Sequence, residues 1–421
     1  MKRSKKTLLA LLSVFVLFLS ACGSSNKQSE ENTSQDSGKT EEKSDTTSSE
    51  EVVLNILVPG YDTGYLKPEL DSIIPNFEKE NPNIKVQVVS AGWDELNSKI
   101  IQLHQANKAC DVMFVGSRSL RQFAENGILE DLTGYVTDEQ KENYIESVFA
   151  TGKVNDKQYG IPMAFSSRGL FYRSDLIKNP PTNWDELLQV SKEQTSGNRK
   201  GFAIPTDITS GTDEILNFIY QNGGKIVDEN GNFVINSKKN IETLEYLKKL
   251  VDYIPDPVST ARDDQAQLFI NDNLAMFISG GWETPTLDEN VKNSPYSVAM
   301  LPDGKQKAVT LVTDSYTIDS TSEHKEEAYK FIEFMGKLEN QKLITASHGW
   351  FPVLKAEADN EIYKSEVNKP MYEMIQYGIP EPQVPSWDDF NKSFTIAVQK
   401  TLTGEMTAEE SLNECQQEVS K

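Results

Sequence analysis

The apolar residues of this chain follow two alternating patterns after residue 52. Short apolar runs at 53–58, 84–88 and 111–115 are typical of strands. The segments 66–80 and 93–105 lie between these runs and carry apolar residues three or four positions apart, which predicts helices. The order strand, helix, strand, helix, strand predicts an α/β fold around a mostly parallel sheet.

The loops that follow these strands are the first candidates for a binding site. Ligands of such sheets collect beyond the carboxyl ends of the strands, which places 59–65, 91–93 and 116–118 at that edge. Arg118 could equally be a solvated surface charge, and Tyr61 and Asp62 could equally serve only the fold. The candidate ligand-binding residues in these loops are Tyr61, Asp62, Trp93, Ser117 and Arg118.

A short sequence pattern recurs at three tryptophans and qualifies one of these candidates. Trp93 and Trp184 each begin Trp-Asp-Glu-Leu, and Trp387 begins the looser Trp-Asp-Asp-Phe. Acidic residues in the first turn of a helix interact favourably with its dipole, so the pattern predicts helix starts. Trp184 is therefore interpreted as structural, while Trp93 and Trp387 stay open between site and core.

The N-terminus carries an export pattern. A basic start precedes an apolar run at 7–19, which is too short for a transmembrane helix and predicts a secretory signal peptide over 1–21. The residues Leu-Ser-Ala before Cys22 resemble the lipobox of bacterial lipoproteins, and this resemblance implies that lipid is attached to Cys22. The rest of 22–51 is almost entirely polar and predicts a disordered tether.

Charge and composition exclude several classes of function. The net charge is −22, from 42 Lys+Arg and 64 Asp+Glu, which disfavours nucleic acid and strongly anionic ligands. The three histidines form no close pair, and no glycine-rich phosphate loop is present, so we expect neither a metal nor a cofactor. Cys110 abuts a predicted buried strand, which favours a packed free thiol, although pairing with Cys415 depends on the fold.

The middle of the chain resembles a known family. The segments 153–163, 169–176 and 180–187 resemble bacterial extracellular solute-binding proteins, in particular the maltose-binding-like group that supplies ABC sugar importers. The segment 269–282 looks like the same family's F-x-x-G-x-x-A-M-x-x-x-G-x-W element, with Asn-Asp-Asn where a small residue is usual. The resemblance covers nearly all of 52–421.

The resemblance implies a two-lobed fold of the periplasmic-binding-protein type (type II), with lobes joined by hinge crossovers and a ligand in the cleft between them. Crossings are expected near 162–165, 300–302 and 334–338. The N-terminal lobe would then comprise 52–163 and 302–334. The C-terminal lobe would comprise 164–301 and 335–421.

The chemistry of a sugar narrows the expected site. A sugar presents hydroxyl groups at its rim and C–H patches on its faces, which suit flat aromatic rings together with carboxylates and arginine. Gly280 and Gly281 let the backbone turn before a Trp-Glu pair, which makes this loop the strongest candidate. Residues on the expected interlobe segments complete the candidates: Phe165, Arg168, Trp282, Glu283, Trp350 and Trp387.

Three functions remain open at this point. The preferred one is a sugar-binding protein held by lipid at the extracellular face of the cell membrane, which delivers its ligand to the permease subunits of an ABC importer and acts as a monomer. The same fold could bind a non-sugar solute such as a polyamine. An exported glycosidase would need two carboxylates about 5 or 6.5–9.5 Å apart, and only Glu283 stands beside a candidate sugar-stacking tryptophan. The motif order disfavours a structural or adhesive protein.

Overall fold

The computed structural model describes residues 51–208, 210–291 and 295–421. The predicted signal peptide, Cys22 and the tether up to residue 50 lie outside the described residues. The three apolar runs at 53–58, 84–88 and 111–115 form neighbouring parallel strands. Strand β1 (Val52–Pro59) lies between β2 (Ile84–Ala91) and β3 (Val112–Gly116), with α1 (Lys67–Glu80) and α2 (Leu96–Gln105) as connections.

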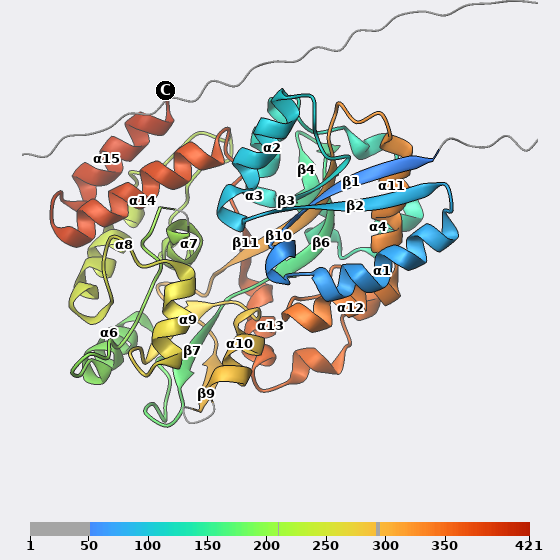
Figure 1. The fold of residues 1–421 in the computed structure, drawn as a ribbon. Coiled ribbons are helices and arrows are strands. Elements are labelled where there is room, and N and C mark those ends of the chain that lie inside the picture. The colour runs from blue at the N-terminus through green and yellow to red at the C-terminus, as the bar shows by residue number, and fades with distance from the viewer. Residues whose placement is uncertain (1–50, 209, 292–294) are drawn as a thin grey trace, which may run out of the picture. The chain divides into compact units, whose positions relative to one another are not determined.

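Three strands from distant parts of the chain complete this first sheet. Strand β10 (Val309–Ile318) pairs antiparallel with β3 and with β6 (Ile161–Ser166), and parallel with β11 (Gly378–Pro380). Figure 1 shows β10 and β6 crossing the middle of the described chain, between β1–β3 and a second group of elements, which comprises the smaller sheet described next and the helices near it. The sheet order is therefore β11-β10-β3-β1-β2, with β6 beside β10.

A second, smaller sheet is antiparallel. Its central strand β7 (Gly169–Arg173) pairs with β8 (Met276–Ser279) and β9 (Tyr296–Ala299). A separate two-stranded hairpin is formed by β4 (Lys153–Val154) and β5 (Lys157–Gln158).

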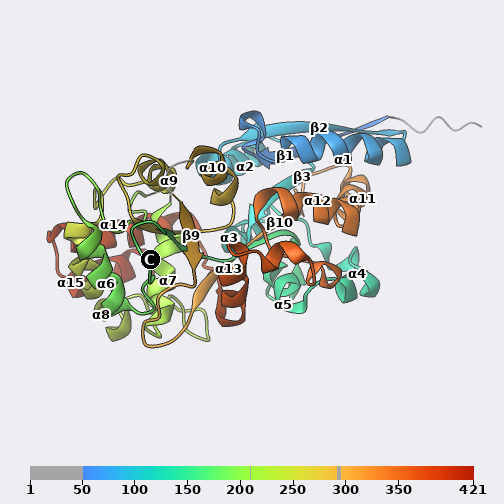
Figure 2. The same cartoon turned by 90° about the horizontal axis from the view of Figure 1, so that it is seen from below.

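The helices divide between these two sheets, as the two views show (Figures 1 and 2). Those near the first sheet are α3 (Ser117–Glu125), α4 (Asp138–Asn143), α5 (Glu146–Phe149), α11 (Lys325–Met335) and α12 (Leu338–His348). Those near the second are α6 (Trp184–Gln194), α7 (Gly211–Gln221), α8 (Lys238–Lys249), α9 (Arg262–Ile270), α10 (Glu283–Asn290), α13 (Asn368–Met374), α14 (Trp387–Thr403) and α15 (Ala408–Val419).

The three Trp-Asp patterns begin helices as predicted. Trp184 and Trp387 are the first residues of α6 and α14, whose starts are capped by the side chains of Asn183 and Ser386. Trp93 begins a short 3-10 helix, Trp93–Glu95, which leads into α2. A capping box also begins α15, because the side chains of Thr407 and Glu410 each accept a hydrogen bond from the other's backbone N–H.

The chain passes between the two sheets several times. It leaves the first sheet between β6 and β7 and returns between β9 and β10. The expected third crossing at 334–338 falls between α11 and α12, both of which pack on α1. After α12 the chain enters the second group as α13, which packs on β7 and β9. It returns to the first sheet as β11 and enters the second group again as α14, which packs on α7 and α8. A lobe boundary at residue 335 stays a prediction, and this packing favours a later one.

Within the described residues, Cys110 and Cys415 are buried free thiols rather than a disulfide. Burial raises the pKa of both thiols to about 11, so neither is reactive at neutral pH. In the same part of the chain, no helix is both long and apolar enough to cross a membrane.

Candidate functional site

A network of buried charges joins the two groups of elements. Arg118, in the first turn of α3, lies with Nη1 2.8 Å from Glu381 Oε1 and 3.6 Å from Asp213 Oδ2. Ser117 Oγ donates a 3.1 Å hydrogen bond to the other Glu381 oxygen. Because Asp213 belongs to α7 and Glu381 follows β11, the predicted pair Ser117–Arg118 connects the first sheet to the second group.

The network continues through two further arginines. Arg262 Nη2, at the start of α9, lies 3.3 Å from Asp213 and 2.8 Å from Glu214. The predicted residue Arg168, between β6 and β7, places Nε 3.0 Å from the same Glu214. Arg168 is 1% exposed and Glu214 is fully buried, so this is a desolvated ion pair, and removal of Glu214 would leave the Arg168 charge uncompensated.

The charges shift one another's pKa values. Burial would lower the pKa of Arg118, but Glu381, Asp213 and Asp314 raise it above its usual range. Burial opposes ionisation of Asp213, yet Arg118, Arg262 and Arg168 lower its pKa. Burial raises the pKa of Glu381 to about 7, in spite of Arg118.

The predicted pair Trp282–Glu283 lies beside this network. The Arg168 guanidinium carbon stands 4.7 Å from the centroid of the Trp282 ring. Trp282 Nε1 and Ser279 Oγ donate hydrogen bonds of 3.2 and 2.9 Å to Glu283 Oε1. Burial raises the pKa of Glu283 to about 7. Glu283 therefore fixes the indole through its N–H, and the Arg168 guanidinium lies over the ring.

The two glycines before Trp282 allow neighbouring groups to approach the backbone closely. The sequence had suggested a different reason, which was the freedom of the backbone to turn. Neither Gly280 nor Gly281 has a positive φ. A Cβ on Gly280 would lie 2.0 Å from Trp282 Cζ3, because the indole folds back over this residue. A Cβ on Gly281 would lie 2.1 Å from the carbonyl oxygen of Gly349. The loop of Trp282 thus touches the loop of Trp350.

An aromatic cluster lies on the other side of this contact. The Tyr65 ring makes edge contacts with Trp93, His348 and Trp350, at centroid distances of 5.3, 4.8 and 5.8 Å. Trp93 is 40% exposed, whereas Trp350 is 4% exposed and stacks on His348. Two predicted residues from distant loops, Trp93 and Trp350, therefore meet through Tyr65.

Other predicted residues occupy less accessible or separate places. Phe165 is 3% exposed, and its backbone pairs with Phe351. Trp387 is 5% exposed and packs on Phe390, with Arg118 5.5 Å from its ring centroid. These two aromatic rings contribute to the core in this structure.

The first loop contributes a different residue from those predicted. The Tyr61 hydroxyl donates to Asp71 at 2.6 Å, and Asp62 is exposed, with its backbone N–H bonded to Ser90. Neither joins the aromatic cluster, whereas Tyr65 of the same loop does.

Sequence reasoning missed several members of the site. The carboxylates of the network lie in segments that carried no motif, and Tyr65 and His348 had only their aromatic character as a signal. The missed residues are Tyr65, Asp213, Glu214, Arg262, Asp314, His348 and Glu381.

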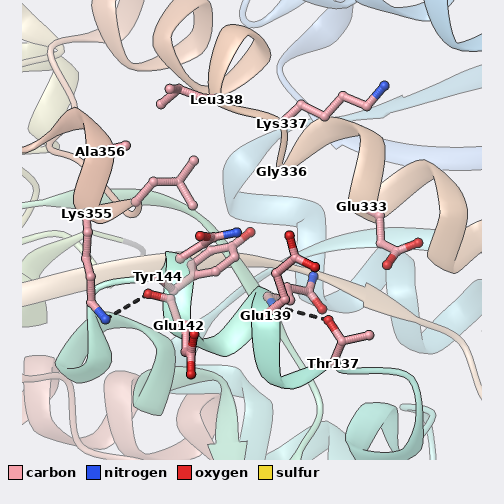
Figure 3. A pocket seen from close by; sticks show the side chains of 13 residues that line it. Thr137, Glu139, Glu142, Tyr144, Glu333, Gly336, Lys337, Leu338, Lys355 and Ala356 are labelled. Atoms are coloured by element: carbon pink, nitrogen blue, oxygen red, sulfur yellow. Dashed lines mark hydrogen bonds between the residues drawn. The ribbon is translucent and has the colours of Figure 1, made fainter.

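A hollow of about 490 Å³ lies elsewhere, where α4 faces the junction of α11 and α12. Figure 3 shows Glu139, Glu333 and Lys337 around it, and Lys355 Nζ donating to the Glu142 carbonyl at 2.8 Å. None of the predicted site residues lines this hollow. The aromatic rings and paired charges between the sheets remain the better candidate site, because they combine the two kinds of group that a sugar requires.

Comparison with known proteins places the chain among binding proteins. The family described as bacterial extracellular solute-binding protein matches residues 63–342. A binding protein of Brucella abortus (strain 2308) is 29% identical over 358 residues, which cover 80% of this chain and 85% of the relative. The galactooligosaccharide-binding protein of Bacillus subtilis (strain 168) is 24% identical over 355 residues, which cover 80% and 82%.

A solved structure shares the fold. An ABC substrate-binding protein from Listeria monocytogenes, in complex with cycloalternan, matches with a TM-score of 0.79 and 24% identity, and the match covers 88% of this chain and 98% of that one. This likeness confirms the predicted fold class, an α/β fold of the periplasmic-binding-protein type.

Proposed function

Because the chain belongs to the bacterial extracellular solute-binding proteins, a family of binding proteins rather than enzymes, we propose that it captures a sugar and delivers it to an ABC importer. The ligand is a mono- or oligosaccharide, and it binds between two lobes that close by hinge bending. The importer's membrane permease subunits are the protein partners, and the binding protein acts as a monomer.

One observation carries the sugar assignment. The loops of Trp282 and Trp350 touch at Gly281 and Gly349, and Arg168 lies over the Trp282 ring within the network of paired charges. Flat rings cover the C–H faces of a sugar, while guanidinium and carboxylate groups bind neighbouring hydroxyls in pairs. The Bacillus subtilis relative is named for galactooligosaccharides, and the Listeria monocytogenes structure contains cycloalternan, which supports the same ligand class.

The ligand class is tested by thermal melting with maltotriose, galactooligosaccharides and spermidine. A ligand that binds only the folded state stabilises it by about 2.7 kcal/mol at a hundred times its Kd. We expect a rise in Tm of several degrees with at least one of the sugars and none with spermidine. A rise with spermidine alone would replace the sugar by a polyamine, and no rise with any sugar would refute the proposal.

The chain is also proposed to be a lipoprotein at the extracellular face of the cell membrane. This rests on the lipobox-like residues before Cys22 and the polar stretch after it. Several acyl chains, at about 0.8 kcal/mol per buried methylene, would hold the protein at the bilayer surface. Cys22→Ala should release the protein from the membrane fraction or leave an unprocessed precursor. A membrane-bound variant of mature size would contradict the anchor.

A further inference from the structure

Asp314 occupies an irregular position in the sheet that joins the two groups of elements. It pairs with Gly116 on one side of β10 and with Ala164 on the other, while the next residue, Ser315, pairs with Pro162. The register of β10 against β6 therefore shifts next to Asp314. Such bulges are common beside functional sites, where they redirect a side chain.

Its neighbour Gly116 leaves room for the Asp314 carboxylate. A Cβ on Gly116 would stand 3.3 Å from Asp314 Oδ1, a tight contact that glycine avoids. Gly116 is also the residue directly before the predicted pair Ser117–Arg118. The carboxylate thus lies at the carboxyl end of β3, at the sheet edge where α/β proteins bind their ligands.

The Asp314 carboxylate has no protein partner among the described residues, since it forms neither a hydrogen bond nor an ion pair there. The nearby arginines are engaged elsewhere: Arg118 with Glu381 and Asp213, and Arg168 with Glu214. Asp314 is half-buried, and burial raises its pKa to about 6, although Arg118 and Arg168 act in the opposite direction. A partly buried carboxylate without protein donors loses part of its hydration, and a ligand can supply donors in place of water.

The Asp314 carboxylate also acts electrostatically on the aromatic cluster. Burial, followed by the charges of Asp314 and Glu69, raises the pKa of Tyr65. Tyr65 in turn contacts Trp93 and Trp350. A ligand resting on these rings would therefore have an acceptor with two oxygens within reach.

We propose that Asp314 is a ligand-binding residue that selects a sugar unit with two neighbouring free hydroxyl groups, which donate to its two carboxylate oxygens. This inference rests on the proposed sugar-binding function. The groups that face Asp314 carry both signs, Arg118 and Arg168 against Asp213, so a neutral polyol suits the position better than an ammonium group. Carboxylates accept such paired hydrogen bonds in a fixed geometry, which makes the position selective.

The test compares wild type with Asp314→Ala and Asp314→Asn. Calorimetric titration uses maltotriose or a galactooligosaccharide, whichever raises the wild-type Tm. We expect Asp314→Ala to raise Kd at least tenfold and Asp314→Asn to raise it less, because the amide keeps one acceptor oxygen. Asp138→Asn, an exposed carboxylate on α4 paired with Lys141, serves as control and should leave Kd unchanged.

Ligand-free melting at pH 7.5 separates this role from a structural one. A carboxylate that lacks a partner costs stability, so Asp314→Asn should melt at the wild-type temperature or a few degrees higher. A large fall in Tm would identify a structural residue and overturn the inference, as would unchanged sugar affinity in both Asp314 variants. If wild type binds no sugar, the proposed function itself fails and the inference fails with it.

Discussion

Replacing Trp282 tests the candidate site most directly, because its indole contacts three different groups. Gly280 lies under the ring, Arg168 stands 4.7 Å from its centroid, and Glu283 accepts its N–H at 3.2 Å. Trp282→Ala removes all three contacts. Trp282→Phe keeps an aromatic ring beside Arg168 but deletes the donor to Glu283.

The ligand-free stability should fall in both variants. A partly desolvated cation–π contact is worth about 1–2 kcal/mol. A hydrogen bond to a charged group is worth about 1.5–3 kcal/mol. We therefore expect Trp282→Ala to lose about 3–4 kcal/mol and Trp282→Phe about half of that. At roughly 2–4 °C per kcal/mol for domains of 150–250 residues, and less for a larger unit, the alanine variant should melt about 5–10 °C lower.

Binding is measured separately by calorimetric titration with the sugar that stabilises wild type. If the indole stacks on the ligand, Trp282→Ala should raise Kd at least tenfold, which corresponds to about 1.4 kcal/mol. Trp282→Phe should retain part of the affinity. The control is Trp184→Phe, which removes a 2.8 Å hydrogen bond to Gln221 and keeps a ring on Tyr246, and should lower Tm without changing Kd. A low Tm with wild-type Kd in Trp282→Ala would refute the ligand contact and leave Trp282 as support for Arg168.

Two further predictions concern the same region. Gly281→Ala should lower Tm and weaken sugar binding, because the added Cβ meets the Gly349 carbonyl at 2.1 Å and overpacking costs about 1–3 kcal/mol. The control is Gly134→Ala, where a Cβ meets nothing within 4 Å. Equal melting of the two variants would contradict the close contact. The ligand-free protein should lose stability as pH rises from 5 to 7.5. Burial raises the pKa of Glu283 and Glu381 to about 7 and of Asp314 to about 6. The folded state is therefore stabilised by the protonated forms, and this stabilisation is lost as pH passes these pKa values. Glu283→Gln should flatten this dependence of Tm on pH at constant ionic strength, and an unchanged dependence would show that Glu283 does not titrate in this range.

Local patterns predicted the elements that depend on near neighbours. The strands near 53–58, 84–88 and 111–115 appear as β1, β2 and β3, because an apolar run between turns has few other ways to bury its side chains. The helix starts at Trp184 and Trp387 followed from acidic residues within one turn. The partners of β10 had no such signal, since its contacts with β3 and β6 join residues about 150–200 positions apart.

The residues of the candidate site also divide into those with a local sequence signal and those defined by contacts between distant segments. Trp282 could be singled out because two adjacent glycines precede it, although the sequence suggested a turn and the structure shows instead a close approach to Gly349. Arg118 could be placed at a strand end, but its partner Glu381 lies 263 residues away, and nothing local in either segment encodes the 2.8 Å contact. Asp314 had the weakest local signal. Its position depends on a register shift between two strands, and it lacks a partner because Arg118 pairs with Glu381 and Arg168 pairs with Glu214. A side chain that is singled out by its lack of hydrogen-bond and ion-pair partners can be identified only after the fold has placed the other charged groups.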